Sequence, residues 1–472
     1  MKKQFSRRDF LKLAGGAAVT VAGVGLLPQF LKKNLVADEI VTAASDYDLF
    51  FAGTDGWFWL PPDPPIGVYH PDPYGADFTP AGVDPFTTYI FGFRDVTHLS
   101  DTQRENQQFK VQHNAPFFWA DQYDGTNEFR VQLTNLGLHL RPDLTDAHTI
   151  HWHGFRNVIP FYDGEPHGSI SVPVGGLFTY VYRPRDPGTY MFHCHVEDVE
   201  HVTMGMTSIV FVRPLQNGDT SFYPSGKYAY NDGDGSTGYD RENALFLSEI
   251  WAKGHWGDAH IQESDWSTFK ADFSLLNGRV HPYTMLPNSP IDFANSDFTD
   301  STKHALTIQT DANGDLATNP GYEHLQYNPH SALVTCNAGE RVLLRFANLG
   351  FREAAMTLAG IKMNVVGRDA SLMKGRDGTD TSYMTNTVLI GAGESYDAIF
   401  EAPAFSGGSG SSGYGYDTYI LYNRRYTQES NLSPGGSGGQ RTEVRVYPAG
   451  TLGSQQYLNQ HPDDITDGSW MA

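Results

Sequence analysis

Two short segments of this chain concentrate the side chains that can bind a transition metal. The first, residues 147–154, contains three histidines. The second, residues 190–206, contains three more histidines and one of the two cysteines of the chain, and it ends on Met206. Seven of the 18 histidines lie between His148 and His201. This concentration argues against scattered structural histidines and predicts a metal site.

Both segments are predicted to be β-strands, because each follows a turn and contains β-branched or aromatic residues. Successive side chains of a strand point to opposite faces. His151 and His153 therefore share one face of the first strand, and His193 and His195 share one face of the second. If the two strands pair, one side of the pair carries four imidazoles.

The opposite faces of the same two strands carry a different set of ligands. His148 and Cys194 point away from the four imidazoles, and His201 and Met206 can join them from the loop after Cys194. Two imidazoles, a thiolate and a weakly bound methionine are the ligands of a blue-copper electron-transfer site. Zinc is an alternative occupant of the His-x-His pairs, because imidazole suits zinc as well as copper.

The two segments resemble those of the multicopper oxidases, the family of laccase and ceruloplasmin. The run His148–Gly154 is similar to their His-x-x-His-x-His-Gly segment. The run from His193 to Met206 is similar to their His-Cys-His signature, although five residues instead of three separate His195 from His201. The resemblance implies a type 1 copper and a type 2/type 3 copper cluster. The implied ligands are His148, Cys194, His201 and Met206 for the type 1 copper, and His151, His153, His193 and His195 for the cluster.

The resemblance also implies an activity. Such an enzyme oxidises a small reductant, phenol-like or a reduced metal ion, at the type 1 copper and reduces dioxygen to water at the cluster. Asp163, in the pair Asp163-Gly164, occupies the place of the family's proton-delivering carboxylate, although a turn-forming Asp-Gly is the alternative. Two other functions stay open: a blue-copper electron carrier and a copper nitrite reductase. The second family lacks a histidine after the copper-binding cysteine, and His195 therefore argues against it.

The number of histidines predicts an assembly. The family's cluster takes four His-x-His pairs from two domains, whereas this chain has only two such pairs. The missing half must then come from another polypeptide, most simply a second copy that meets the first across a two-fold axis. We therefore expect a homo-oligomer with its copper domains in contact, and a redox protein is a further possible partner.

Composition indicates an all-β protein of two or three domains, at roughly 150 residues per domain. Gly, Pro and aromatic residues are frequent, and long helical periodicities are lacking. A net charge of −21 argues against nucleic acid as a partner and favours the approach of cations. The expected boundaries are 45–214 for a copper-binding domain, 215–240 for a linker or long loop, 241–449 for a second domain, and 450–472 for a polar acidic tail. Within the first domain, residues 45–115 are interpreted as loops and early strands, with the main copper-binding part beginning at Phe117.

The second domain repeats the first without its ligands. Residues 341–350 are similar to residues 128–137, and the segments that follow align in the same order. The family's fold would make both domains cupredoxin-like Greek-key β-sandwiches or barrels, the second one free of copper. The positions that replace the ligands His148, His151, His153, His193, Cys194 and His195 are, in that order, Ala354, Thr357, Ala359, Tyr422, Asn423 and Arg424.

The N-terminus has the features of an export signal. Arg7 and Arg8 precede an apolar run of small residues, 13–27, which is too short for a confident membrane span. This pattern resembles a twin-arginine signal, so that residues 1–44 are expected to direct a folded chain to the periplasm or the exterior. The remaining cysteine, Cys336, is expected to be a buried thiol, since a disulfide with Cys194 would remove the copper ligand.

Overall fold

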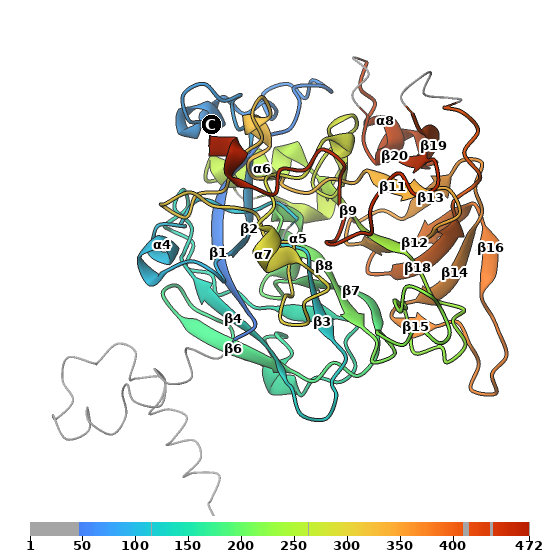
Figure 1. The fold of residues 1–472 in the computed structure, drawn as a ribbon. Helices are drawn as coiled ribbons and strands as arrows, with labels where there is room; N and C mark the ends of the chain where they lie inside the picture. The colour runs from blue at the N-terminus through green and yellow to red at the C-terminus, as the bar shows by residue number, and fades with distance from the viewer. Residues whose placement is uncertain (1–46, 115, 263, 409–414, 435–437, 472) are drawn as a thin grey trace, which may run out of the picture. The chain divides into compact units, whose positions relative to one another are not determined.

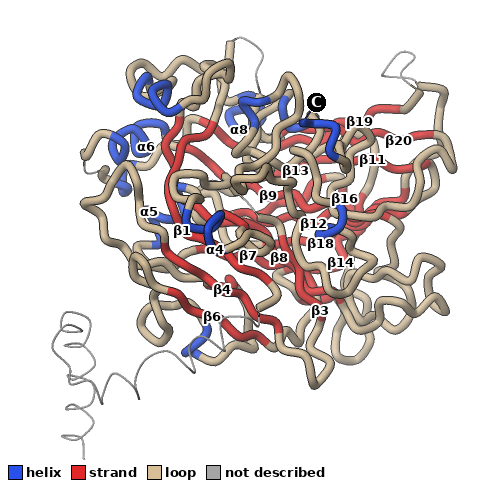
Figure 2. The backbone as a smooth tube through the Cα atoms, turned by 60° about the vertical axis from the view of Figure 1, so that its left-hand side comes forward, coloured by secondary structure: helices blue, strands red, loops and turns tan. Residues whose placement is uncertain are grey.

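β-Strands dominate the fold (Figure 1, Figure 2). The computed structural model describes residues 47–471, apart from 115, 263, 409–414 and 435–437, so that the predicted export signal lies outside the described residues. The strands up to residue 213 are β1 (Leu49–Phe58), β2 (Thr88–Asp95), β3 (Phe118–Asp121), β4 (Phe129–Asn135), β5 (His151–His153), β6 (Leu177–Tyr182), β7 (Gly188–His193) and β8 (Thr207–Arg213). The later strands are β9 (Arg241–Ile250), β10 (Phe273–Leu276), β11 (Val334–Asn337), β12 (Arg341–Asn348), β13 (Ala354–Leu358), β14 (Met363–Arg368), β15 (Ser371–Leu372), β16 (Tyr383–Thr385), β17 (Thr387–Ile390), β18 (Ser395–Glu401), β19 (Asp417–Asn423) and β20 (Arg441–Tyr447).

The helices are short and lie in the connections between strands (Figure 1). None of those in the described ranges is long and apolar enough to cross a membrane. The α-helices are α4 (Asp101–Glu105), α5 (Asp198–Met204), α6 (Ala252–Ala259), α7 (Phe293–Ser296) and α8 (Tyr426–Ser430). The 3-10 helices are η1 (Pro73–Phe78), η2 (Pro160–Tyr162), η3 (Trp266–Thr268), η4 (Tyr283–Met285), η5 (Glu323–Leu325) and η6 (Gly468–Met471).

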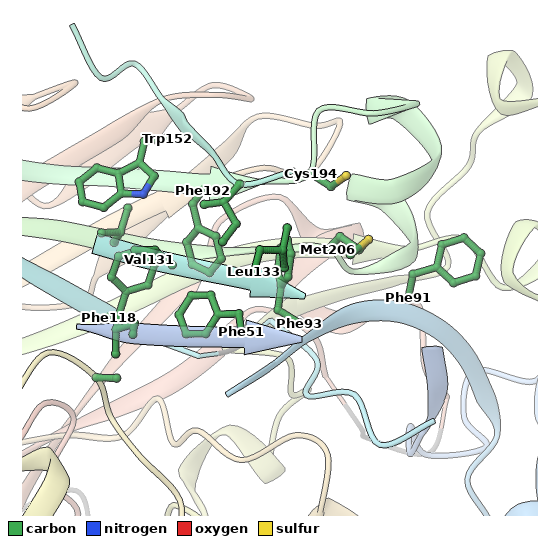
Figure 3. Packing of buried hydrophobic residues seen from close by; sticks show 14 of the residues in the cluster. Phe51, Phe91, Phe93, Phe118, Val131, Leu133, Trp152, Phe192, Cys194 and Met206 are labelled. Carbon is green, nitrogen blue, oxygen red and sulfur yellow. The ribbon is translucent and has the colours of Figure 1, made fainter. Parts of the chain in front are cut away.

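The strands up to residue 213 form two four-stranded sheets, in the orders β2-β1-β4-β6 and β3-β8-β7-β5. Both sheets contribute to one aromatic core, in which Phe51, Phe118, Trp152 and Phe192 are completely buried (Figure 3). Alternation along each strand sends one set of side chains into this core. β1 and β2 are therefore full members of the first sheet, although the sequence placed the main copper-binding part only from Phe117 onward.

The strands from residue 241 onward repeat this arrangement. In the first half β1 runs parallel to β4, and β4 pairs antiparallel with β6. In the second half β9 runs parallel to β12, and β12 pairs antiparallel with β18. The other sheets match as well, since β3 is parallel to β8 as β11 is to β20. The internal repeat predicted from residues 341–350 and 128–137 thus corresponds to β12 and β4, which occupy equivalent places.

A buried ionic network joins the two halves. The guanidinium of Arg345 lies 2.7 Å from Glu242 and 3.4 Å from Asp397, and all three side chains are almost completely buried. Asp397 accepts a hydrogen bond of 2.6 Å from the hydroxyl of Thr189 at the start of β7, and another of 2.6 Å from Tyr230. Tyr230 belongs to the segment 215–240, which contains no helix or strand. The strand that ends at the ligand segment is therefore held by the second half of the chain.

Candidate metal centre

Strand pairing brings the two predicted ligand segments together. β5 pairs antiparallel with β7, so that His151 lies opposite His193 and His153 lies opposite Met191. The backbone of Cys194 follows β7 directly, and its N–H donates to the carbonyl of Met206 at 3.0 Å. This ladder contains His151, His153 and His193, whereas His148 lies before β5 in an isolated bridge with Val172, and Cys194 and His195 follow β7. The ligands fall into two groups.

The first group surrounds the sulfur of Cys194. His148, Cys194 and His201 each offer one ligand atom, and these three atoms all lie within 4.8 Å of one another. Sγ of Cys194 lies 3.2 Å from Nδ1 of His201 and accepts a hydrogen bond of 3.4 Å from the N–H of Thr149. Met206 is close by, and its sulfur lies on the same side of the core as that of Cys194 (Figure 3). All four predicted type 1 ligands are 0% exposed.

His201 reaches Cys194 on a helix, whereas the sequence predicted a loop. The five residues between His195 and His201 lead into α5, which begins after Glu197 in a left-handed conformation (φ 45°) and ends at Gly205 (φ 121°). A Cβ at Gly205 would lie 2.7 Å from the carbonyl oxygen of Phe91, which leaves room only for glycine. The additional residues between His195 and His201 therefore belong to a helical turn, which places the ring of His201 beside the sulfur of Cys194.

Electrostatics favour the thiolate of Cys194. Burial alone would raise its pKa, but the neighbouring His201 and His148 hold the pKa of the thiol well below its usual value. Burial would likewise lower the pKa of His201, but the charges of Cys194 and Asp146 raise it to about 10. A thiolate is the form of cysteine that binds a metal, and a bound ion would take the place of the proton on Nδ1 of His201.

The second group contains the histidines on the other face. Ligand atoms of His151, His153 and His193 lie within 4.8 Å of one another, and the ring of His195 lies 4.9 Å from that of His151. Burial lowers the pKa of His193 to about 3 and also lowers those of His151 and His153, which keeps these imidazoles neutral. Neutral imidazole is the form that binds metals.

Backbone carbonyls orient two of these rings. Nδ1 of His151 lies 2.7 Å from the carbonyl oxygen of Asp163, and Nδ1 of His193 lies 2.8 Å from that of Cys194. Each Nδ1 then carries the proton, which leaves Nε2 as the metal-binding atom. The predicted residue Asp163 also has a carboxylate oxygen 3.4 Å from His151, and burial raises its pKa. It lies beside the second group, and its role in proton delivery stays a prediction.

Two family models with the description "Multicopper oxidase" match this sequence, one at residues 126–217 and the other at residues 252–408. The chain belongs to the multicopper oxidase family. The first match contains all eight predicted ligands, and the second covers most of the repeated half. Copper is therefore the metal expected here, and the group around Cys194 resembles a type 1 copper site.

Relatives share this family at low identity. Laccase-12 of Arabidopsis thaliana is 24% identical over 258 residues, which are 54% of this chain and 34% of that protein. Ceruloplasmin of Mus musculus is 36% identical over 76 residues, which are 15% of this chain and 6% of that protein. The matches thus span about a third or less of these relatives' own length. The crystal structure of Blue Copper Oxidase from Nitrosomonas europaea is 18% identical to this chain and has a TM-score of 0.52. The match covers 84% of this chain and 85% of that chain, and it supports a mostly β fold of cupredoxin-like sandwich sheets.

The chemistry of the first group fits copper. Both ring nitrogens of His148 and Nε2 of His201 are buried without a hydrogen-bond partner, which is costly unless an ion or another polar group satisfies them. The second group fits less completely, since the multicopper cluster needs more histidines than this face provides. Multicopper oxidases would place the remaining cluster histidines on a second domain. In the second half of this chain, Thr357 pairs with Tyr422 at the positions that correspond to His151 and His193.

Amide side chains occupy the corresponding type 1 position of the second half. Asn423 replaces Cys194, and its N–H donates to the carbonyl of Gln440 as that of Cys194 does to Met206. The two amides also share a side-chain hydrogen bond of 2.8 Å, and both are buried. In the described residues of this half, the repeat therefore keeps the backbone of the metal site and replaces its ligands by hydrogen-bonded amides.

Proposed function

We propose that this protein is a copper-dependent oxidoreductase that oxidises a small reductant and passes the electrons to dioxygen. The observation that carries the proposal is the arrangement of two ligand groups on opposite faces of one strand segment. Cys194 belongs to one group, and its neighbours His193 and His195 belong to the other. Copper, when bound, supplies one-electron redox chemistry at the first group and reduction of dioxygen at the second.

The side chains of this chain have distinct tasks in this scheme. Cys194, His148 and His201 would hold the ion at the first group, and Met206 would be a weak fourth ligand. The covalent bonds from Cys194 to its neighbours give electrons a short path to the second group. Asp163 lies against His151 and is positioned to exchange protons with the solvent side.

We further propose that the cluster is shared between two copies of this chain. The support is the half-set of histidines in the first domain together with the absence of ligands at Thr357, Tyr422 and Asn423. In this scheme the sheets form two Greek-key cupredoxin domains, of which the second is free of copper. The substrate would be phenol-like or a reduced metal ion, and a redox protein could also donate electrons. The twin-arginine pattern supports a periplasmic or extracellular location.

Copper content and EPR of copper-loaded protein test this proposal, together with the mass of the oligomer in solution. We expect more than one copper per chain, both type 1 and type 2 signals, an oligomer, and consumption of dioxygen with hydroquinone. His153→Ala should lose the type 2 signal and keep the blue absorption, whereas His167→Ala, at an exposed histidine, should keep both.

Two results would overturn parts of the proposal. One copper per chain with a type 1 signal alone would make the protein a blue-copper electron carrier, which the incomplete set of histidines supports as the second candidate. A monomer with full oxidase activity would refute the shared cluster but would leave the type 1 site untouched.

A further inference from the structure

The type 1 ligands have no surface that a reductant can touch. His148, Cys194, His201 and Met206 are all 0% exposed, so that electrons have to cross protein to reach them. One short route leads past Asp146, whose carboxylate is 20% exposed and lies 3.9 Å from Nε2 of His201. A carboxylate is not readily oxidised, so this route offers only direct tunnelling. The structure contains a second route, made of three oxidisable rings and one phenylalanine next to His201.

A file of aromatic rings runs from the surface to His201. Successive ring centroids are 6.1 Å apart from Tyr74 to Trp57, 5.4 Å from Trp57 to Tyr89, 5.6 Å from Tyr89 to Phe91, and 5.8 Å from Phe91 to His201. All these separations lie within the range of about 4.5–7 Å at which aromatic side chains interact. Tyr74 is 37% exposed, whereas the three rings between it and His201 are at most 2% exposed.

The antiparallel pairing of β1 and β2 creates the file. Trp57 lies directly opposite Tyr89, and Asp55 lies opposite Phe91. Tyr89 and Phe91 are two residues apart and therefore share a face, as do Asp55 and Trp57. Helix η1 carries Tyr74 and closes over Trp57. The file thus follows one face of one strand pair.

A proton acceptor accompanies the central ring. The hydroxyl of Tyr89 donates a hydrogen bond of 2.7 Å to a carboxylate oxygen of Asp55, and the N–H groups of His139 and Leu140 donate to the same carboxylate at 2.8 Å. Burial raises the pKa of Asp55 and, with the charge of Asp55, raises that of Tyr89 well above its usual value. Loss of an electron from a tyrosine requires its proton to leave, and here the acceptor is already in place.

We propose that Tyr74, Trp57 and Tyr89 form an electron relay from an external one-electron reductant to the type 1 copper. This inference rests on the proposed function, because the type 1 ion is the final acceptor. Tyr89 loses one electron to Cu(II), which becomes Cu(I), and its phenol proton moves to Asp55. Trp57 then returns an electron to Tyr89, and the proton moves back from Asp55. Tyr74 in turn reduces Trp57 and releases its phenol proton to solvent, and hydroquinone, the reductant in the test below, restores Tyr74 by giving it a hydrogen atom. In total one electron passes from hydroquinone to copper, one proton passes to solvent, and a semiquinone is left.

The relay predicts kinetic effects that a purely structural role would not produce. In oxidised, copper-loaded protein mixed anaerobically with hydroquinone, Trp57→Phe and Tyr89→Phe should slow the bleaching of the blue absorption by on the order of tenfold. Both variants should keep the wild-type EPR spectrum and reduction potential of the type 1 site. Trp119→Phe is the matched control, because Trp119 is completely buried in the core, where its ring stacks on Phe211 and meets Phe298 edge-on, outside the file.

Metal-free protein gives an independent measurement. Azidyl radicals generated by pulse radiolysis oxidise tryptophan, and transfer to tyrosine then appears as a concentration-independent rise of tyrosyl absorption. A fast component of this rise should be lost in Trp57→Phe and Tyr89→Phe and kept in Trp119→Phe. Unchanged bleaching rates would place electron transfer on the Asp146 side and overturn the relay, as would unchanged radical transfer. Lack of a blue absorption in the wild type would instead overturn the proposed function, while the metal-free measurement would still decide whether Trp57 and Tyr89 exchange electrons.

Discussion

Gly53 keeps the space that His148 needs, and Gly53→Ala should therefore perturb the type 1 site directly. A Cβ at this position would lie 2.6 Å from Cδ2 of His148 and 3.4 Å from Cε of Met206. Carbon atoms prefer separations of about 3.5–4.0 Å, so the imidazole would have to move by roughly 1 Å. His148 is completely buried, which leaves it little room for such a shift.

The expected cost is that of overpacking a core, about 1–3 kcal/mol of unfolding free energy. Gly92→Ala is the matched control, because its Cβ would lie 2.3 Å from a methyl group of Val111 and then nearest to the backbone carbonyls of Gln112 and Gly205, instead of meeting a ligand side chain first. Neither glycine has a positive φ, so steric contact is what each substitution adds. Urea unfolding of the metal-free proteins should show similar losses for both variants.

Only Gly53→Ala should change the copper site. Displacement of one imidazole should weaken the blue absorption of the copper-loaded protein and alter its EPR spectrum, while Gly92→Ala should match the wild type. A wild-type spectrum in Gly53→Ala, combined with the expected loss of stability, would show that His148 does not bind the ion. That outcome would remove one of the two imidazoles from the predicted ligand set.

Three further predictions concern the ligand sulfur, bound copper and the buried ionic network. Cys194→Ala should abolish the blue absorption, whereas Cys336→Ala, at the other completely buried cysteine, should preserve it; loss of colour in both would contradict the assignment. Removal of copper by a chelator should lower the thermal midpoint of unfolding of the wild type, because a ligand of the native state stabilises it. In Cys194→Ala the drop should be smaller, because only copper at the imidazole group is there to be removed. Arg345→Met should cost about 3–5 kcal/mol at neutral pH, because it leaves two buried carboxylates without a counter-charge. The exposed Arg376→Met should change stability by less than about 0.5 kcal/mol. Acid should reduce the cost of Arg345→Met, since protonation neutralises the stranded carboxylates; a cost independent of pH in urea unfolding would contradict this reasoning.

Period-two alternation predicts much of the candidate site from sequence. Strand alternation predicts the separation of His148 and Cys194 from His151 and His193, and the structure places these residues in two groups, although His148 and Cys194 lie just outside β5 and β7. The repeat in the second half could also be predicted, because the similarity of residues 341–350 to residues 128–137 needs no tertiary information. The predicted domain boundaries and the roles of the ligands stay predictions.

Other features depend on tertiary contacts that a sequence does not display. Helix α5 was missed, although Asp198 and Glu200 in its first turn and Gly205 at its end are helix signals that could have revealed it. The part played by Gly53 had no such signal, because the contact with His148 exists only after β1 pairs with β4. The file of rings along β1 and β2 was missed for the same reason, since Trp57 and Tyr89 meet only across strands.

The anchoring of β7 to the second half has a consequence for metal uptake. Thr189 is tied to Asp397 through its hydroxyl and to Ser395 through its carbonyl, so that the start of the ligand strand is fixed by a half whose own amides already satisfy one another. Folding of that half does not have to wait for an ion. The second half thus holds the strand that leads into Cys194 in position before any ion binds, and copper would enter a site that the folded polypeptide has already formed.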